Sequence, residues 1–361
     1  MKIYQLLPVL SYGDAIGNDT IALYNIIKGA GYDTYIYAEV VDKRISSEIC
    51  SDINQFRGVE KEDVIIYHLS TGSELNYQVV NYDCRIMIIY HNITPPQYFN
   101  GYNIEAYRNC RRGLAAARFL RDKVDYALAD SEFNREELLR MGYQCDVDVL
   151  PILIPFDDYE KAPNAKIIEQ YQDGKDNIIF TGRIAPNKKQ EDVIAAFALY
   201  KKQYNSNARL ILVGAYEAMP RYYEQLKQYV KELDVEDVVF TGHVPFDEIL
   251  AYYRVADCFL CMSEHEGFCV PLIEAMYFQI PIVAYDSTAI GDTLGGSGWL
   301  LADKDPATVA GVLNRLLSDK ELKNEIIKGE RYRLEDFNHT VIEKQFFKCL
   351  EYFLKNEKTV L

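Results

Sequence analysis

Short apolar stretches alternate with longer amphipathic stretches from one end of the chain to the other. The short stretches are rich in Ile, Val and Tyr, and the longer ones repeat their apolar positions at helical spacing. This alternation is typical of repeated βαβ units that build mostly parallel sheets. It predicts two sets of strands, at residues 2–7, 34–38, 64–68, 85–90, 126–129 and 148–150, and at residues 178–181, 209–213, 238–241, 258–262 and 281–285.

The two sets are separated by the segment 151–157, in which Pro151 and Pro155 block a helix and interrupt a strand ladder. A chain of 361 residues also exceeds what one hydrophobic core commonly fills. We therefore predict an α/β protein with two Rossmann-like domains, at residues 1–152 and 153–337. An amphipathic helix at about 338–361 has no strand after it and can pack back on either domain. In such sheets ligands bind beyond the carboxyl ends of the strands, so the informative residues should follow the strands.

Charge and composition narrow the possible functions. The net charge of −15 disfavours a nucleic-acid partner, because the phosphate backbone attracts basic surfaces. Eight scattered cysteines indicate reduced thiols, and for the Cys258–Cys261 pair a core strand is favoured over a metal or redox site. The short apolar start of the chain has no cleavage signal, and no apolar run reaches the ~18 residues of a membrane span. The sequence thus predicts a cytoplasmic protein.

A first cationic motif follows the strand predicted at 178–181. Gly182 permits a sharp turn there, and Arg183 and Lys188 lie ahead of a helix that should begin near Glu191. A planar guanidinium and an ammonium together suit a diphosphate that gains negative charge as its sugar leaves. The alternative is a loop whose cations are only solvated.

A second motif follows the strand predicted at 258–262 and runs into a helix. Pro271 fits the first turn of that helix, where its missing N–H costs nothing. The helix start would offer backbone donors and a positive dipole end to an anion, while two carboxylates are suited to accept hydrogen bonds from vicinal hydroxyls. The residues assigned to this motif are Glu266, Gly267, Phe268, Cys269 and Glu274.

These motifs resemble those of the retaining glycosyltransferase family 4, which has the GT-B fold and depends on nucleotide-sugars. The resemblance lies in Gly182-Arg183 with Lys188, in Glu266 followed by Glu274, and in the segment 127–135, and it covers nearly all of the chain. It implies two Rossmann-like domains that face each other across a cleft, and transfer of a hexose with retention at its anomeric carbon. It also implies that no metal ion or other cofactor is required.

The resemblance further implies roles for single residues. Arg183 and Lys188 would bind the diphosphate and steady the departing nucleotide, Glu274 would hold the ribose, and Glu266 would orient the sugar. Residues 241–245, with His243 and Val244, occupy the place of the family's base-binding segment. A UDP-sugar or a GDP-sugar is the expected donor, and a glycan or lipid-linked molecule in surface polysaccharide or glycolipid assembly is the expected acceptor.

The first half supplies candidates for the acceptor side. Gly17 lies in the loop after the first strand, where it could approach the donor, and Asn18 or Asp19 is the predicted N-cap of the next helix. His91 and His68 each end a strand, which favours a place near the site. The segment 91–95 resembles a branch of the family in which this histidine lies near the sugar, so we assign His91 to catalysis and His68 to the acceptor side.

A row of arginines stands out on this acidic protein. They lie within about a third of a turn on a helical wheel, either as a solvated helix face or as a contact with anionic lipid at the inner face of the cell membrane. The arginines of this row are Arg108, Arg111, Arg112 and Arg118.

Other functions explain the sequence less well. A metal-dependent transferase would use a DxD pair, which Asp146 and Asp148 match, but they precede the interdomain segment rather than follow a strand into a cleft. A nucleotide-sugar epimerase of similar fold and a non-catalytic glycan- or nucleotide-binding subunit are the remaining alternatives. The intact pairs of cations and glutamates disfavour both of them.

Overall fold

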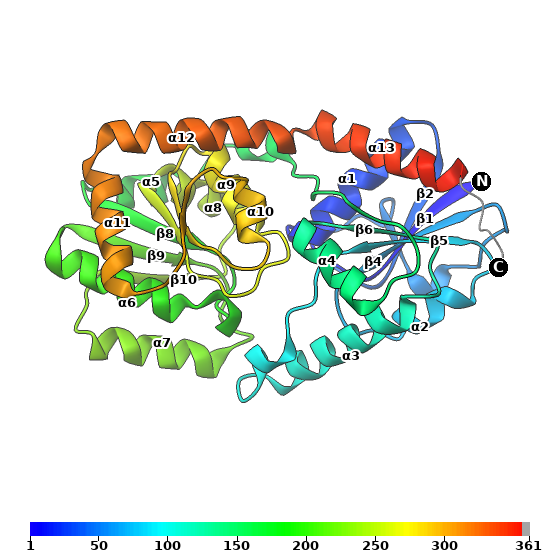
Figure 1. The fold of residues 1–361 in the computed structure, drawn as a ribbon, viewed down its shortest axis with the longest axis horizontal. Helices are drawn as coiled ribbons and strands as arrows, with labels where there is room; N and C mark the ends of the chain where they lie inside the picture. The colour runs from blue at the N-terminus through cyan, green and yellow to red at the C-terminus, as the bar shows by residue number, and fades with distance from the viewer. Residues whose placement is uncertain (356–361) are drawn as a thin grey trace. The chain divides into compact units, whose positions relative to one another are not determined.

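The chain forms two compact units, as a computed structural model of the protein that describes residues 1–355 shows (Figure 1). Unit 1 contains Met1–Gln97, Glu105–Pro155 and the segment from Asp336 onward, and unit 2 contains Tyr98–Ile104 and Phe156–Glu335. The predicted boundary at 152 lies three residues before the observed one. The sequence pattern did not indicate that the segment 98–104 would pack with the second half of the chain.

Unit 1 is built on a parallel sheet of seven strands within the described residues, in the order β3-β2-β1-β4-β5-β6-β7. Its strands are β1 (Lys2–Leu10), β2 (Asp33–Val41), β3 (Cys50–Asp52), β4 (Val64–Leu69), β5 (Arg85–Tyr90), β6 (Tyr126–Ala129) and β7 (Val147–Val149). Its helices are α1 (Ala15–Gly29), α2 (Leu75–Gln78), α3 (Ile104–Leu120), α4 (Glu132–Met141) and α13 (His339–Lys355).

Unit 2 has a second parallel sheet, of six strands within the same described range, in the order β10-β9-β8-β11-β12-β13. Its strands are β8 (Asp176–Thr181), β9 (Ala208–Val213), β10 (Val238–Gly242), β11 (Cys258–Cys261), β12 (Ile282–Tyr285) and β13 (Trp299–Leu301). Its helices are α5 (Ala165–Tyr171), α6 (Gln190–Gln203), α7 (Pro220–Glu232), α8 (Phe246–Arg254), α9 (Val270–Tyr277), α10 (Ile290–Leu294), α11 (Pro306–Ser318) and α12 (Lys320–Leu334). Helix α11 packs beside α6, and α12 beside α9.

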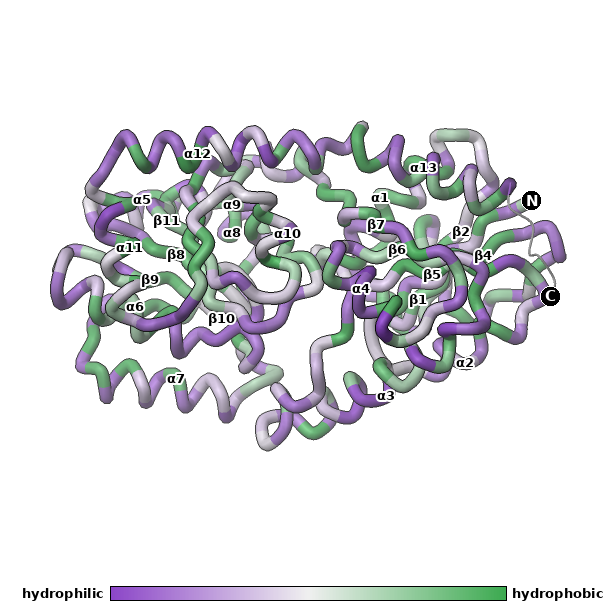
Figure 2. Tube along the Cα trace, in the orientation of Figure 1, coloured by the Kyte–Doolittle hydropathy of each residue, from purple (hydrophilic) through white to green (hydrophobic). Residues whose placement is uncertain are grey.

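Apolar residues are concentrated on the strands. Figure 2 shows hydrophobic colour along the inner strands and mostly hydrophilic colour along α12. Burial on both faces explains the near-continuous apolar runs, because helices cover both sides of a parallel sheet. Cys258 and Cys261 lie buried in β11 as free thiols, which confirms that this CxxC belongs to a core strand.

The last helix packs on unit 1. Ile342, Phe346 and Phe353 of α13 are buried in one cluster with residues of β1, β4, β5 and β6. The guanidinium of Arg85 lies 4.0 Å from the centroid of the Phe353 ring, and its Nη1 donates to the carbonyl of Leu354 at 3.3 Å. The apolar face of α13 therefore completes the core of unit 1.

The start of α1 corrects the sequence prediction. The N-cap is Asp14 rather than Asn18 or Asp19, and Asp14 Oδ1 accepts the N–H of Gly17 at 2.6 Å. Gly13, with a φ of +76°, turns the chain just ahead of this cap, so the helix begins earlier than predicted. Asp19 is instead buried, and its Oδ1 accepts the backbone N–H of Leu153 at 2.8 Å.

Strand order identifies the point in each sheet at which a ligand is expected. In unit 1 the strands after β1 are added on one side of it and the strands after β4 on the other side, so the strand order reverses between β1 and β4. In unit 2 the order reverses in the same way between β8 and β11. Open α/β sheets bind ligands outside the carboxyl ends of the strands at this switch point. Of the two motifs predicted in the second half of the chain, the first follows β8 and the second follows β11, which are the two switch-point strands of unit 2. Among residues 1–355 no helix is long and apolar enough to cross a membrane.

Candidate functional site

The loops after β8 and β11 are joined by an ion pair in unit 2. Lys188 Nζ lies 2.6 Å from Glu266 Oε1, and the Glu266 side chain is buried. Burial lowers the pKa of Lys188, but the carboxylate of Glu266 and the nearby thiol of Cys269 raise it more, so the net shift is upward. Lys188 therefore remains an ammonium at neutral pH. The two predicted motifs meet at this contact.

Hydrogen bonds to backbone groups hold the same two loops together. The carbonyl of Asn187 accepts the N–H of Glu264 at 2.8 Å, and Asn187 Nδ2 donates to the carbonyl of His265 at 3.0 Å. Glu266 N–H donates to Thr288 Oγ1 at 2.9 Å, which ties the loop to the segment after β12. The position of the Glu266 carboxylate is thus fixed from several sides.

Arg183 lies in the loop after β8, and its side chain is exposed. Its backbone carbonyl accepts from Gln190 Nε2 at 3.1 Å, whereas its guanidinium is exposed and forms no hydrogen bond or ion pair with any residue from 1 to 355. The adjoining Gly182 has a φ of +148°, and a Cβ on Gly214 would lie 2.2 Å from the Gly182 carbonyl. The turn that presents Arg183 therefore depends on two glycines in close approach.

Helix α9 begins at Val270, with Pro271 in its first turn as predicted. Gly267, Phe268 and Cys269 precede it, and Cys269 has a left-handed φ of +74°. The carbonyl of Phe268 accepts from Thr293 Oγ1 at 2.5 Å. This turn directs the amino end of α9 toward the carboxyl end of β11, where the helix dipole favours an anion.

Glu274 is held by two tyrosines that the sequence analysis did not identify. Its carboxylate accepts from the hydroxyl of Tyr253 at 2.6 Å and from that of Tyr159 at 3.0 Å. Burial raises the pKa of Glu274, while these two hydrogen bonds lower it, and the net shift is upward. A carboxylate offers about four acceptor positions, so two remain for the hydroxyls of a ligand.

Glu264 and His265 complete the loop before Glu266. Glu264 pairs with Lys304 at 2.6 Å and with Lys189 at 3.6 Å. The buried ring of His265 has a pKa lowered to about 4, first by desolvation, so it is neutral at physiological pH. Tyr98, from the segment that joins unit 2 from the first half of the chain, lies with its ring centroid 6.3 Å from that of His265.

The other predicted donor residue, Gly17, and the base-binding candidates are placed as follows. Gly17 is buried in the first turn of α1 in unit 1, where a Cβ would lie 2.1 Å from the carbonyl of Ser11. His243 is exposed and Val244 half-buried in the loop after β10, near the carboxyl edge of the sheet of unit 2. Their roles toward a donor stay predictions.

His91 and His68 are buried side by side in unit 1. His68 Nδ1 lies 2.8 Å from His91 Nε2, and their rings are stacked with centroids 5.1 Å apart. His91 Nδ1 lies 3.0 Å from Asp130 Oδ2, and His68 Nε2 lies 2.9 Å from Gln5 Oε1. Both nitrogens of each ring are therefore hydrogen-bonded within unit 1, and the roles of the two histidines toward an acceptor stay predictions.

Among residues 1–355, two groups of side chains bring possible metal ligands within 4.8 Å of one another. In the first, Asp19 approaches His68 and His91, whose ring nitrogens are all hydrogen-bonded and have no lone pair directed at a shared point. In the second, Cys261 and Cys269 approach Glu266, and the ammonium of Lys188 already contacts that carboxylate and would repel a metal cation. In neither group do these side chains present a set of free ligand atoms that would suit a metal ion.

The arginine row lies on α3, and its members differ in their contacts. All four side chains are exposed. Arg112 Nη2 pairs with Glu74 Oε1 at 2.5 Å, and Arg118 Nη1 donates to the carbonyl of Leu114 at 3.4 Å. Arg108 and Arg111 extend from the same helix.

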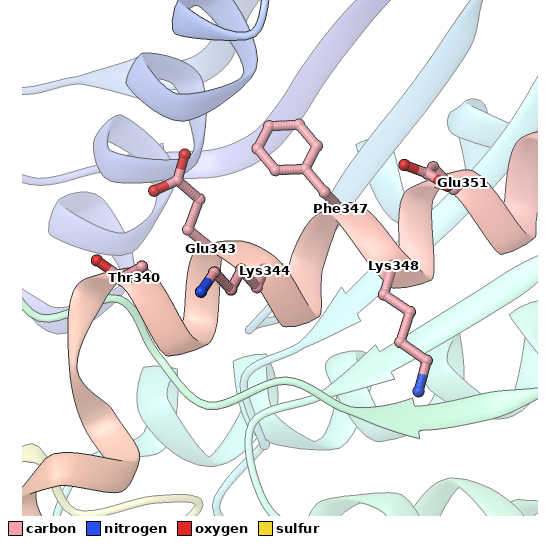
Figure 3. A pocket seen from close by; sticks show the side chains of 6 residues that line it. All are labelled: Thr340, Glu343, Lys344, Phe347, Lys348 and Glu351. Carbon is pink, nitrogen blue, oxygen red and sulfur yellow. The ribbon is translucent and has the colours of Figure 1, made fainter.

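Two surface depressions of unit 1 involve residues of α13. The one in Figure 3 has a volume of about 420 Å³ and is lined by residues of α13 alone, among them Glu343, Phe347 and Lys348. A second contains the Asp146 and Asp148 carboxylates, and Asp146 Oδ2 accepts from the hydroxyl of Tyr352 at 2.7 Å. The DxD letters thus belong to the edge strand β7 and its packing with α13.

Comparison with known proteins bears on the family and the fold. Residues 162–333 match the family model described as glycosyl transferases group 1. This part of the chain is therefore similar to that family of glycosyltransferases. The resemblance to glycosyltransferase family 4 is therefore confirmed at the level of a GT-B glycosyltransferase, and the predicted fold class is confirmed with it.

Several characterised proteins are similar over part of the chain. A D-inositol 3-phosphate glycosyltransferase of Jonesia denitrificans is 29% identical over 206 residues, which are 55% of this chain and 48% of that protein. An alpha-monoglucosyldiacylglycerol synthase of Streptococcus pneumoniae is 25% identical over 236 residues, 62% of this chain and 52% of that protein. The chain spans about half the length of the curated relatives it matches.

Solved structures match over nearly the whole chain. Anabaena HepE in complex with UDP and glucose has a TM-score of 0.77 at 18% identity, and covers 98% of this chain and 100% of that one. Sucrose-phosphate synthase of Thermosynechococcus elongatus has a TM-score of 0.75 at 16% identity, with 98% and 99% covered. At these identities the likeness shows the fold alone.

Proposed function

We propose that this protein is a retaining glycosyltransferase that moves a hexose from a nucleotide diphosphate-sugar to a glycan or lipid-linked acceptor without a metal ion. The observation that carries the proposal is the contact of Lys188 with Glu266, which joins the loops after β8 and β11 at the switch point of unit 2. A UDP- or GDP-sugar is the proposed donor.

The chemistry follows from what these side chains can do. The difficult event is departure of a nucleoside diphosphate, on which negative charge grows as the bond to the sugar breaks. Lys188, the exposed Arg183 and the amino end of α9 supply positive charge and donors for that group. Glu266 then orients the sugar and Glu274 binds the ribose, while the leaving phosphate accepts the proton of the acceptor hydroxyl on the same face.

Related proteins support the substrate class. The names of the Jonesia and Streptococcus proteins describe transfer to an inositol phosphate and synthesis of a glucolipid, and an Escherichia coli relative is an O-antigen chain mannosyltransferase. Anabaena HepE was solved with UDP-glucose. Surface polysaccharide or glycolipid assembly in the cytoplasm is therefore the proposed setting.

The first test is donor binding measured as a rise in melting temperature. We expect one of the UDP-, GDP- or dTDP-sugars to stabilise the protein, by about 2.7 kcal/mol at a concentration one hundred times its Kd, since it binds only the folded state. The rise should persist in EDTA, because protein cations bind the diphosphate. A rise that requires added Mg²⁺ would contradict the metal-free mechanism.

Product analysis separates transfer from epimerisation. Incubation of the stabilising nucleotide-sugar with an acceptor should give free nucleoside diphosphate and a glycosylated acceptor whose anomeric configuration matches that of the donor. Incubation without an acceptor should leave the nucleotide-sugar unchanged. A new nucleotide-sugar epimer in the second reaction would favour the epimerase alternative.

The arginine row of α3 provides the proposed membrane contact. Exposed basic residues near an anionic bilayer contribute about 1 kcal/mol each, so changing all four to glutamate should abolish co-sedimentation with vesicles containing phosphatidylglycerol. The matched control changes four exposed cations of unit 2 to glutamate, at Arg315, Lys320, Lys328 and Arg331, and should still bind. Equal binding of wild type and the α3 variant would show that the row is a solvated helix face.

A further inference from the structure

A chain of buried polar side chains crosses four strands of unit 1. Gln5 lies on β1 and His68 on β4, while His91 follows β5 and Asp130 follows β6. These strands are consecutive neighbours in the sheet, in the order β1-β4-β5-β6. All four side chains are buried, and the Gln5 and His68 residues are 0% exposed, so water cannot replace a missing hydrogen-bond partner.

The orientation of the Gln5 amide is determined at one end of the chain. Gln5 Nε2 lies 3.2 Å from the backbone carbonyl of Thr20, which can only accept a hydrogen bond. The NH₂ group of Gln5 must therefore face Thr20, and its Oε1 faces His68 at 2.9 Å. Because Oε1 is also only an acceptor, His68 Nε2 must carry a proton.

The proton on His68 Nε2 determines which of the remaining ring nitrogens donate and which accept hydrogen bonds. A neutral His68 with its proton on Nε2 has an acceptor at Nδ1, which lies 2.8 Å from His91 Nε2. His91 Nε2 must then donate. On the other side of the ring, His91 Nδ1 faces a carboxylate oxygen of Asp130 at 3.0 Å and donates to it. With Asp130 ionised, both nitrogens of His91 are donors.

We propose that His91 is held as a doubly protonated imidazolium paired with Asp130, and that Gln5 and His68 are the positioning residues that fix this charge. A neutral imidazole has only one donor, so with Asp130 ionised and His68 neutral the acceptors on both sides of His91 place the second proton on that ring. The predicted catalytic histidine would thereby be a permanent buried cation at the end of β5, rather than a group that exchanges protons with a substrate. This charge state does not depend on the identity of the donor sugar.

The surrounding charges act in the same direction. Burial lowers the pKa of His91, but Asp130, and then Asp19 and Asp14 of the neighbouring α1 segment, raise it above its ordinary value. Burial and the charge of His91 lower the pKa of His68 well below its ordinary value, so the second positive charge is excluded there. Burial raises the pKa of Asp19 itself to about 7.

The alternative arrangement places one proton differently. Burial also raises the pKa of Asp130, and a protonated Asp130 would donate to His91 Nδ1 and leave His91 neutral. The two arrangements have the same net charge, so they cannot be separated by counting charge. They differ in whether His91 Nδ1 bears a hydrogen, which nitrogen chemical shifts report directly.

The test is long-range proton–nitrogen NMR of the full chain labelled at its five histidines with ¹⁵N. The His91 signals are assigned with a His91→Gln variant. Near neutral pH we expect both His91 nitrogens to show shifts of protonated nitrogen, and His68 to show one protonated and one unprotonated nitrogen. An unprotonated-type nitrogen on His91 in the wild-type protein would overturn the proposal without any variant or activity assay.

Two variants then test the role of Gln5. Gln5→Leu removes the acceptor for His68 Nε2, so His68 can move its proton to Nδ1 and donate to His91, and the pH of His91 titration should fall by about one unit or more. Gln5→Glu keeps an acceptor oxygen at that place, and His91 should remain doubly protonated. A purely structural role of Gln5 would alter the melting temperature of both variants and leave the His91 titration of Gln5→Leu unchanged.

Discussion

Replacing Lys188 by alanine is expected to lower the turnover number for sugar transfer by about 100- to 1,000-fold, equivalent to about 2.7 to 4 kcal/mol of barrier. The reason is that the ammonium lies where the loops after β8 and β11 meet and would stabilise charge on the departing diphosphate. Arg183→Ala should have an effect of the same size, since its guanidinium is exposed in the same loop after β8 and is the second proposed diphosphate ligand. Steady-state transfer at saturating donor measures both.

The two variants should differ in stability. Loss of Lys188 leaves the buried carboxylate of Glu266 without its cation, which costs about 3 to 5 kcal/mol when a buried pair is broken, whereas Arg183 has no partner of this kind. Activity is therefore compared only at temperatures where each variant is folded. The matched control is Lys202→Ala, which removes an exposed lysine of α6 and should retain full turnover. Wild-type turnover in both Lys188→Ala and Arg183→Ala would refute the proposed roles.

The strands were predictable from sequence where both faces of the sheet are covered. The bounds predicted for 85–90 and 126–129 coincide with β5 and β6, because their apolar runs end abruptly at polar residues. The strands β3 and β13 were not predicted. Each has only three residues at a sheet edge, and β13 follows a segment with glycines at 295, 296 and 298, so neither has an apolar run long enough to indicate a strand.

The meeting of Lys188 with Glu266 could be anticipated for a physical reason. Each follows a strand of a parallel sheet, and the carboxyl ends of such strands share one edge. The tyrosines that hold Glu274 could not be found this way, because Tyr253 comes from α8 and Tyr159 from the segment before α5. Their approach depends on how helices pack, which strand periodicity does not encode.

The buried series of hydrogen bonds from Gln5 to Asp130 could not be predicted from the sequence either. His68 and His91 could be assigned to strand ends, but their contact depends on β4 and β5 being neighbours in a defined register. Gln5 lies within an apolar strand, where a single polar residue usually indicates a bend or an exposed face. Only the sheet order shows that it is the acceptor at one end of a hydrogen-bonded series.

The stability of unit 2 is expected to fall as pH rises from about 4.5 to 8 because of one buried carboxyl group. Glu330 of α12 is 0% exposed, its Oε1 accepts the N–H of Ile282 at 2.8 Å, and its Oε2 has no hydrogen-bond partner among the described residues. Burial raises the pKa of Glu330 from 4.5 to about 8, partly opposed by the Ile282 hydrogen bond. The folded state therefore holds a proton that the unfolded chain releases.

The sign and size follow from proton linkage. Stability from this group is fully present below the unfolded pKa and is lost as pH rises toward the folded pKa, at about 1.36 kcal/mol per unit, or about 3 kcal/mol by pH 7. Glu330→Gln keeps an acceptor for Ile282 and removes the ionisation, so its stability should lose this pH dependence. Urea unfolding between pH 5 and 8 measures the difference between the two proteins, in which the contributions of all other carboxylates cancel.

The chain offers a local probe and a matched control for this measurement. Trp299 of β13 is the single tryptophan of the chain, and it pairs with Val283 of β12, the residue that follows Ile282. Its fluorescence therefore reports unfolding of unit 2 beside the buried carboxyl group. Glu325→Gln changes an exposed glutamate of the same helix and should follow the wild-type pH dependence. If Glu330→Gln also runs parallel to wild type from pH 5 to 8, Glu330 is ionised in the folded protein. The unpartnered Oε2 would then have to be stabilised as an anion inside an apolar core, which costs far more than keeping the proton.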